Sequence, residues 1–156
     1  MINFEGLFFT KESYAFLKSL EKQKLPISSD IYHCTFKLFP DKNEVFSNLI
    51  GKEFEVEIIG YASDEMNSGF LINIPDELKE YYLNYNENGK LITPHITTSI
   101  NYGAKNRNTQ NLKFEKFNKS YKVKGIFGMN VRKNNKNVII IDSKYIEYKN
   151  YKRYNY

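Results

Sequence analysis

The sequence predicts an α+β fold made of two copies of a strand–helix–strand–strand unit, with mainly antiparallel sheets. Composition is the first reason: the 156 residues are 41% hydrophobic and 16% aromatic, which suits a packed core and argues against disorder. Periodicity is the second, because short apolar or alternating runs are separated by two segments that begin with helix-capping residues. The third reason is that these elements follow the same order in both halves of the chain.

The first half is predicted to contain a strand, a helix and two more strands. The aromatic run at residues 2–9 indicates a strand, and Thr10 can cap a helix that ends near residue 24, before a proline. Residues 31–39 indicate a strand closed by Pro-Asp. The alternation of apolar and acidic residues at 54–61 indicates a strand with one solvated face. The apolar stripe of the helix would contain Phe16, Leu17 and Leu20.

The second half repeats this order. Residues 69–74 indicate a strand, and Asn73 can cap a helix that carries Pro75 in its first turn and continues through PDELKEYYLNY. The turn sequence NENG then ends the helix, and a strand over residues 91–100 follows.

Two further strands are expected near the end of the chain, at residues 121–131 and 137–146. Asn134 and Asn135 lie between them and favour a tight turn. Residues 149–156 read as a basic, tyrosine-rich tail.

The two halves match in spacing as well as in order. His33 follows Gly6 by 27 positions and His95 follows Gly69 by 26, and a helix-capping residue stands four positions after each glycine. We therefore predict one bilobal domain over residues 1–148, arranged around a pseudo-twofold axis and a central cleft, with exchange of strands between the lobes left open. The lobes would be residues 1–65 and 66–148.

Both histidines of the chain are followed two positions later by a threonine. In a strand, residues two apart share a face, so His33 projects with Thr35 and His95 projects with Thr97, while the residue between them points the other way. Two imidazoles on either side of one phosphate can act as general base and general acid, and threonine hydroxyls can donate to its oxygens. Which histidine would be the acid is left open.

The motifs HCTF and HITT resemble the paired H-h-[T/S]-h motifs of the two-histidine (LigT-like) phosphoesterase superfamily, over residues 2–146. The resemblance implies a metal-independent phosphodiesterase without a cofactor. It implies that His33 and His95 form the acid–base pair and that Thr35 and Thr97 bind the phosphate. The bilobal fold predicted from the repeat is also the fold that this resemblance implies.

The resemblance extends to two branches of the superfamily. The segments NYGAKNRNTQN and YKVKGIFG are similar to the cyclic phosphodiesterase domain of eukaryotic tRNA ligases. The small chain also resembles phage-encoded anti-CBASS nucleases, which degrade cyclic oligonucleotide signals of host immunity. Thr98 departs from the family, which more often has an aliphatic residue there.

We accordingly expect cleavage of 3′–5′ bonds in cyclic oligonucleotide second messengers. Three alternatives stay open: a phosphodiesterase for RNA 2′,3′-cyclic phosphate ends, a protein that binds cyclic nucleotides without cleaving them, and a basic surface that binds RNA.

Further candidates for substrate binding are Lys37 and Ser99, which continue the alternation of the two motif strands, and Tyr102 and Lys105 in the loop after the second motif. Arg107 in the same loop could contact phosphate. Each could equally be an ordinary solvated residue of a strand or polar turn. Cys34 and Tyr32 should face away from His33 and pack in the interior, and the orientation of Cys34 excludes a Cys–His dyad within the motif.

The net charge of +5 and the pI near 9.1 favour anionic partners only weakly, because Lys, Asn and Tyr are abundant throughout. A single cysteine excludes an intrachain disulfide and a cysteine-rich metal site. No apolar run approaches the ~18 residues of a membrane span. We expect a cytoplasmic protein (host cytoplasm if phage-encoded) with no metal, no membrane contact and no obligate protein partner.

Overall fold

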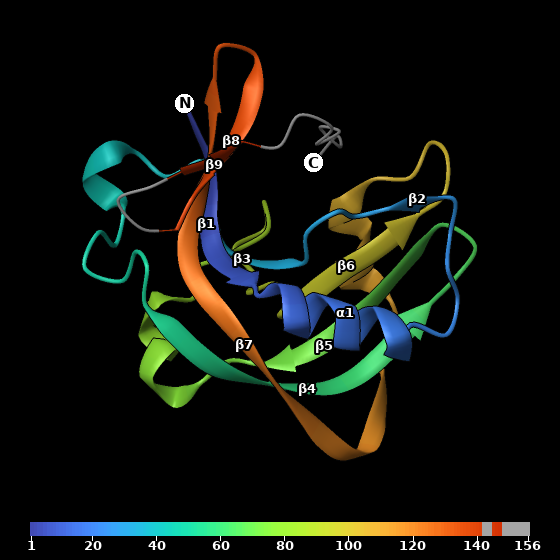
Figure 1. Cartoon of the computed structure of the whole chain (residues 1–156). Helices are drawn as coiled ribbons and strands as arrows, with labels where there is room; N and C mark the ends of the chain where they lie inside the picture. Colours follow the sequence, from blue (N-terminus) through green and yellow to red (C-terminus); the bar gives the residue numbers. More distant parts are fainter. Residues whose placement is uncertain (142–144, 148–156) are drawn as a thin grey trace.

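The computed structural model describes residues 1–141 and the backbone of 145–147 (Figure 1). The strands are β1 (Ile2–Phe9), β2 (Ile27–Ser28), β3 (His33–Leu38), β4 (Glu53–Ser63), β5 (Asn67–Asn73), β6 (His95–Ile100), β7 (Glu115–Lys133), β8 (Lys136–Ile140) and β9 (Tyr145–Glu147). The helices are α1 (Lys11–Leu20) and the short 3₁₀ segments η1 (Lys42–Glu44), η2 (Asp76–Tyr81) and η3 (Asn106–Asn111). The predicted tail at 149–156 lies outside the described residues.

One antiparallel sheet forms the body of the molecule, in the order β2-β6-β5-β4-β7-β1-β3, with β8 and β9 extending from β7. This confirms the α+β class and the mainly antiparallel pairing. The sheet curls, so that β3 at one end lies against β6 near the other. This curl brings the two predicted motif strands together.

The two halves of the chain interleave within this sheet. β4 of the first half pairs with β5 of the second, and β7 of the second half pairs with β1 of the first. The order of the main strands is β3-β1-β7-β4-β5-β6. Exchanging β1 with β5, β3 with β6 and β4 with β7 gives the same order read from the opposite end.

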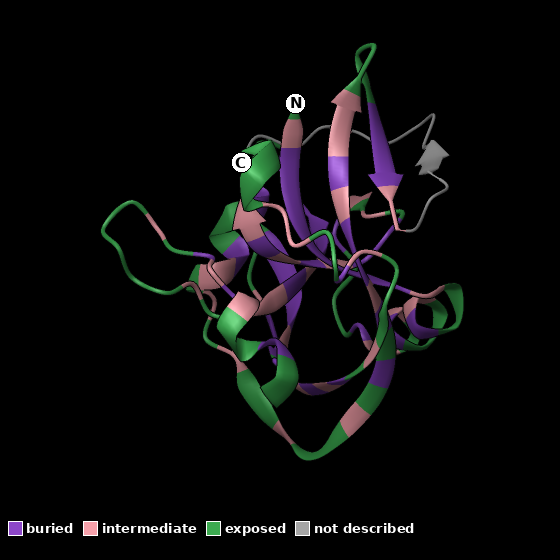
Figure 2. Ribbon diagram, turned by 90° about the vertical axis from the view of Figure 1, so that its left-hand side faces the viewer, coloured by how far each residue is buried: buried purple, intermediate pink, exposed green. Residues whose placement is uncertain are grey.

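The curled sheet carries two hydrophobic clusters. The larger one contains Leu7, Phe36, Phe70 and Phe127, and a smaller one joins Phe4 and Phe8 to residues of β8 and the segment before β3. Figure 2 shows that buried residues follow the central strands, whereas exposed residues lie on the loops, on the helical segments and along the first part of β7. The burial of β4 alternates as predicted, with Val56 and Ile58 inside.

Thr10 caps α1 as predicted, because its hydroxyl accepts a hydrogen bond from the Ser13 backbone at 3.3 Å. The helix ends at Leu20 instead of near residue 24. Beyond the helix, backbone N–H groups bind side chains of other elements instead of helical carbonyls. Gln23 N donates to Tyr61 Oη and Leu25 N donates to Ser99 Oγ, each at 3.0 Å. Phe16, predicted to be in the apolar stripe, is 40% exposed and packs on Tyr121.

The predicted helix capped by Asn73 is wrong. Asn73 is the last residue of β5, and Pro75 precedes the 3₁₀ turn η2. The next backbone donor after this turn, Leu83 N, binds the carbonyl of Phe36 in β3. Only Leu78 of η2 is buried, so the segment gains little from a full amphipathic helix.

The strand ends differ from their predicted positions, while the turn between β7 and β8 is confirmed. β6 begins at His95, whereas residue 91 forms only an isolated bridge, and β7 runs six residues further towards the N-terminus than expected. Asn134 and Asn135 have φ values of 51° and 61°, as a tight hairpin turn requires. The short strand β2 was not predicted, and residues 142–144 of the predicted last strand lie outside the described part. No helix in the described residues could span a membrane.

Candidate functional site

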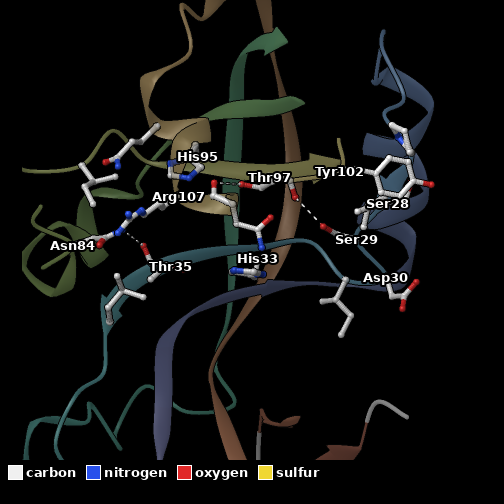
Figure 3. Close-up of a pocket in the computed structure, with 17 residues that line it drawn as sticks. Ser28, Ser29, Asp30, His33, Thr35, Asn84, His95, Thr97, Tyr102 and Arg107 are labelled. Carbon is white, nitrogen blue, oxygen red and sulfur yellow. Dashed lines mark hydrogen bonds between the residues drawn. The ribbon is translucent and has the colours of Figure 1, made fainter. Parts of the chain in front are cut away.

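His33 and Thr35 from β3, and His95 and Thr97 from β6, line one cleft of about 380 Å³. Figure 3 shows the four side chains around a common space, with the two rings contributed from opposite walls. The four residues are half-buried. The structure thus brings together the two pairs that the sequence singled out, although 62 positions separate the histidines.

A glycine lets each motif strand approach its neighbour. Gly6 pairs with Thr35, and Gly69 pairs with Thr97. A Cβ on Gly6 would overlap the carbonyl oxygen of Cys34, and a Cβ on Gly69 would lie 2.5 Å from the carbonyl oxygen of the residue after His95. Any side chain at these glycines would therefore push a motif strand out of place.

The ring of His95 is oriented by the backbone. Its Nδ1 lies 2.7 Å from the carbonyl oxygen of Thr93, so Nδ1 must carry the hydrogen of this bond. Nε2 is then the atom left for proton exchange. Burial lowers the pKa of His95, and the Thr93 carbonyl opposes this by stabilising the imidazolium.

His33 has an aromatic environment instead. Its ring stacks on Phe4 with centroids 4.5 Å apart and lies 6.0 Å from Phe8. Burial, followed by the charge of His95, lowers the pKa of His33 from 6.5 to about 4. His33 is therefore neutral near pH 7, and His95 is the ring that is protonated first on acidification.

The two threonines are held in different ways. Thr97 Oγ1 donates to Thr109 Oγ1 at 2.9 Å and also lies 3.3 Å from the Asn106 carbonyl, both in η3. The backbone carbonyl of Thr35 accepts a hydrogen bond from Asn84 Nδ2 at 3.3 Å. The Thr35 hydroxyl has no hydrogen bond within the described residues, so it can donate to a ligand directly.

Thr109 and Asn67 form a buried hydrogen-bond chain behind Thr97, and no sequence pattern predicts it. Asn67 Nδ2 donates to Thr109 Oγ1 at 3.1 Å, and both residues are at most 2% exposed. Since Thr109 accepts from Asn67, its own hydrogen is available for Thr97 Oγ1 whenever Thr97 turns its hydrogen towards a ligand.

Two candidates from the motif strands, Lys37 and Ser99, are not among the residues that line the cleft. Each strand has a β-bulge at the third residue after its histidine, because the pairing skips Phe36 in β3 and Thr98 in β6. A bulge reverses the alternation of faces beyond it. Lys37 instead pairs with a glutamate of η1 at 2.6 Å, and Ser99 is fully buried and accepts a bond from a backbone N–H.

The three candidates from the loop after the second motif differ in whether their side chains line the cleft. Tyr102, 74% exposed, and Arg107 both line the cleft. The side chain of Lys105 does not line it, and the residue contributes its backbone carbonyl, which accepts from Asn67 Nδ2 at 2.9 Å. The cleft also contains residues that the sequence did not suggest, chiefly the segment 26–31 with β2, and Asn84.

The residues between and beside the motif pairs face the interior. Cys34 is buried, and burial raises the pKa of its thiol to about 12, which excludes a thiolate nucleophile near neutral pH. Tyr32 is buried against Tyr14. Thr98, which follows the second motif pair directly, is fully buried and donates to the Ser68 carbonyl at 3.0 Å.

Among the described residues, no group of three or more His, Cys, Asp or Glu is arranged to hold a metal ion. No family model matches the chain, and no curated protein matches it.

Proposed function

We propose that this protein is a phosphodiesterase of the two-histidine type, which cleaves 3′–5′ bonds of cyclic oligonucleotide signals without using a metal ion. One observation carries the proposal: two histidine–threonine pairs from strands far apart in the chain line a single cleft. A phosphate between them would meet two proton-transfer groups and two hydroxyl donors.

The environments of the rings suggest how the roles divide. Neutral His33 takes the proton of the 2′-hydroxyl, whose oxygen attacks the adjacent phosphorus. The bond from phosphorus to the 5′-oxygen breaks, and His95 Nε2–H protonates this leaving oxygen. The products are a 2′,3′-cyclic phosphate and a 5′-hydroxyl, and the net effect on the enzyme is one proton moved from His95 to His33.

His95 is suited to the acid role because the Thr93 carbonyl holds Nδ1–H through the whole reaction. His33 is suited to the base role because its aromatic and buried surroundings keep the ring neutral, and its pKa is about 4. An anionic phosphate in the cleft favours the protonated form of a nearby imidazole, so substrate binding supports the charge on His95. The threonine hydroxyls stabilise the charge that develops on the non-bridging oxygens.

The topology supports an origin of this site in a duplicated unit, as in the two-histidine superfamily. The sheet order is unchanged when the strands of one half replace those of the other. Gly6 and Gly69 approach the motif strands at equivalent places, and both strands have a bulge three residues after the histidine. The halves differ in their helices, since α1 corresponds to the 3₁₀ turn η2.

The test is incubation of the purified protein with 3′,3′-cyclic dinucleotides in the presence of a chelator, followed by chromatography of the products. We expect linear products, and we expect His33→Ala and His95→Ala each to lower kcat by ~10²–10⁴ from the loss of acid–base catalysis. Thermal melting checks that both variants fold. Full activity in either variant contradicts the proposal.

The same experiment separates the alternatives when an RNA with a 2′,3′-cyclic phosphate end is assayed in parallel. If the protein opens the RNA 2′,3′-cyclic phosphate and leaves the cyclic dinucleotide intact, its substrate is an RNA end, as in RNA repair. Binding of an intact cyclic dinucleotide, without products, would make the protein a sequestering protein instead of an enzyme.

A further inference from the structure

The charges around the cleft are few and lie apart. Among the described residues that line it, Arg107 is the one cationic side chain besides the histidines, and Asp30 is the one carboxylate. In Figure 3, Arg107 lies on the side of Thr35 and Asn84, whereas Asp30 lies with Tyr102 on the opposite side.

Arg107 stands on a firmly held segment. The residue before it, Asn106, receives a bond from Thr97 Oγ1 through its backbone carbonyl, and Thr109 two positions later contacts the same hydroxyl. Within the described part of the chain, the guanidinium of Arg107 has neither an ion pair nor a hydrogen bond to another residue. The backbone of Arg107 is therefore held in place, while the five N–H donors of its guanidinium are available to a ligand.

One phosphate is already supplied with donors by the two histidine–threonine pairs. At neutral pH both rings are uncharged, because burial lowers the pKa of each, so they add no standing positive charge to the cleft. A guanidinium is permanently charged, and its planar fork matches two oxygens of a phosphate. The side chain lies on the side of the cleft that holds Thr35 and Asn84 (Figure 3).

We propose that Arg107 binds a second, non-reacting phosphate of the substrate, so that the preferred ligands carry at least two phosphate groups. This inference rests on the proposed function and narrows its substrate class. A cyclic dinucleotide supplies the second phosphate within its ring, and a linear substrate supplies it from a neighbouring nucleotide.

The test compares adenylyl-3′,5′-adenosine, which has one phosphate, with the same dinucleotide carrying an additional 5′-phosphate or 3′-phosphate. The measured quantity is the ratio of kcat/KM with and without the additional phosphate. We expect the ratio at one of the two ends to be about 10 to 100 in the wild-type protein, as a charge-assisted hydrogen bond provides. It should fall towards one in Arg107→Gln and stay high in Lys113→Gln, which removes an equal charge from an exposed residue outside the cleft.

Two results would overturn the second phosphate site. An unchanged ratio in Arg107→Gln overturns the inference, even if that variant is slower on all substrates, because a contact to the reacting phosphate would reduce all rates alike. A wild-type ratio near one at both ends also overturns it. If the wild-type protein cleaves none of these linear substrates, the assay with cyclic dinucleotides still decides the proposed function, and dissociation constants for the same ligands and variants then test the second phosphate site alone.

Discussion

At the scale of single residues, the most informative difference is between the two histidine rings. His95 has a backbone acceptor 2.7 Å from Nδ1, whereas His33 has the faces of Phe4 and Phe8. Aromatic carbon provides nothing that stabilises an imidazolium by hydrogen bonding at its nitrogens, and a carbonyl oxygen does. Two residues of the same type thus acquire different tendencies to hold a proton.

This difference predicts an acidic optimum for kcat/KM. The proposed general base, His33, must be neutral, which sets the rising limb near its pKa of about 4. The proposed general acid, His95, must be protonated, and its pKa lies below the ordinary 6.5, so activity should fall at higher pH. A pH profile of kcat/KM with a cyclic dinucleotide should therefore have its maximum on the acidic side of neutrality. A maximum above pH 7 would contradict the assigned roles.

Thr109 is predicted to position Thr97. The change Thr109→Val keeps the methyl group that lies against Gly69 and removes the hydroxyl. We expect kcat to fall about threefold to tenfold, the value of one hydrogen bond, with KM little changed. Steady-state kinetics with the proposed substrate measure both constants.

The matched variant is Thr109→Ser, which keeps the hydroxyl and loses the methyl group. It should retain kcat near the wild-type value even if its melting temperature falls. A variant Thr109→Ser that is as slow as Thr109→Val would show that Thr109 acts through packing alone.

At the scale of elements, the strands depend on glycine at two close approaches. Gly6→Ala and Gly69→Ala each place a Cβ against the backbone of a motif strand, which cannot move as a side chain does. We expect each change to lower the free energy of unfolding by about 1–3 kcal/mol, the usual cost of overpacking, and to reduce activity because the histidine is displaced. Denaturant unfolding and the cleavage assay measure the two effects.

Gly125→Ala is the graded comparison for these variants. The three atoms nearest to a Cβ there belong to the side chains of Leu7 and Phe9 and lie 3.3–3.5 Å away, whereas the nearest backbone atoms at Gly6 and Gly69 lie no more than 2.5 Å away. Its loss of stability should be smaller than that of either glycine beside a motif strand. An equal loss would mean that the sheet, and not the close approach, is sensitive to any added methyl group.

The same strands show how far sequence patterns reach. The period-two pattern placed His33 and Thr35 on one face correctly, as it did for the second pair. It was wrong for Lys37 and Ser99, which lie just beyond the bulges. A bulge depends on how the neighbouring strand is paired, so the sequence of one strand does not reveal it. The helix predicted after Asn73 was wrong for a related reason, because β3 takes a backbone donor from that segment.

At the scale of the whole molecule, the site exists because the sheet curls. β3 and β6 are not hydrogen-bonded neighbours, yet they face each other across the cleft. The repeat in the sequence suggested that the two histidines could meet, but no local pattern contains the curl. The segment 26–31 entered the cleft unpredicted for the same reason, since its place depends on β2 pairing with β6.

The fold also encloses two carboxyl groups that the proposed reaction does not use. Glu5 in β1 is fully buried. Its Oε2 accepts a bond from the Phe46 backbone at 3.3 Å, and its Oε1 has no partner within the described residues. Glu21, just after α1, is 7% exposed, and its Oε2 is likewise without a partner there. Burial raises the pKa of both carboxyls above the ordinary 4.5, against the opposing effect of nearby donors and lysines.

These carboxyls predict the pH dependence of stability. Above pH 4.5 and below the raised pKa, the folded chain binds more protons than the unfolded chain, so the glutamates make stability fall as pH rises. His33 acts in the opposite direction between about pH 4 and 6.5, because there the unfolded chain binds more protons. The double variant Glu5→Gln, Glu21→Gln removes the first contribution and keeps the second. Its melting temperature should match the wild-type value near pH 4 and exceed it at pH 8, because the margin grows between pH 4.5 and the raised pKa and is then kept. A lower melting temperature at pH 8 would mean that the two ionised carboxylates stabilise the fold through their neighbouring lysines, which overcome the cost of burial.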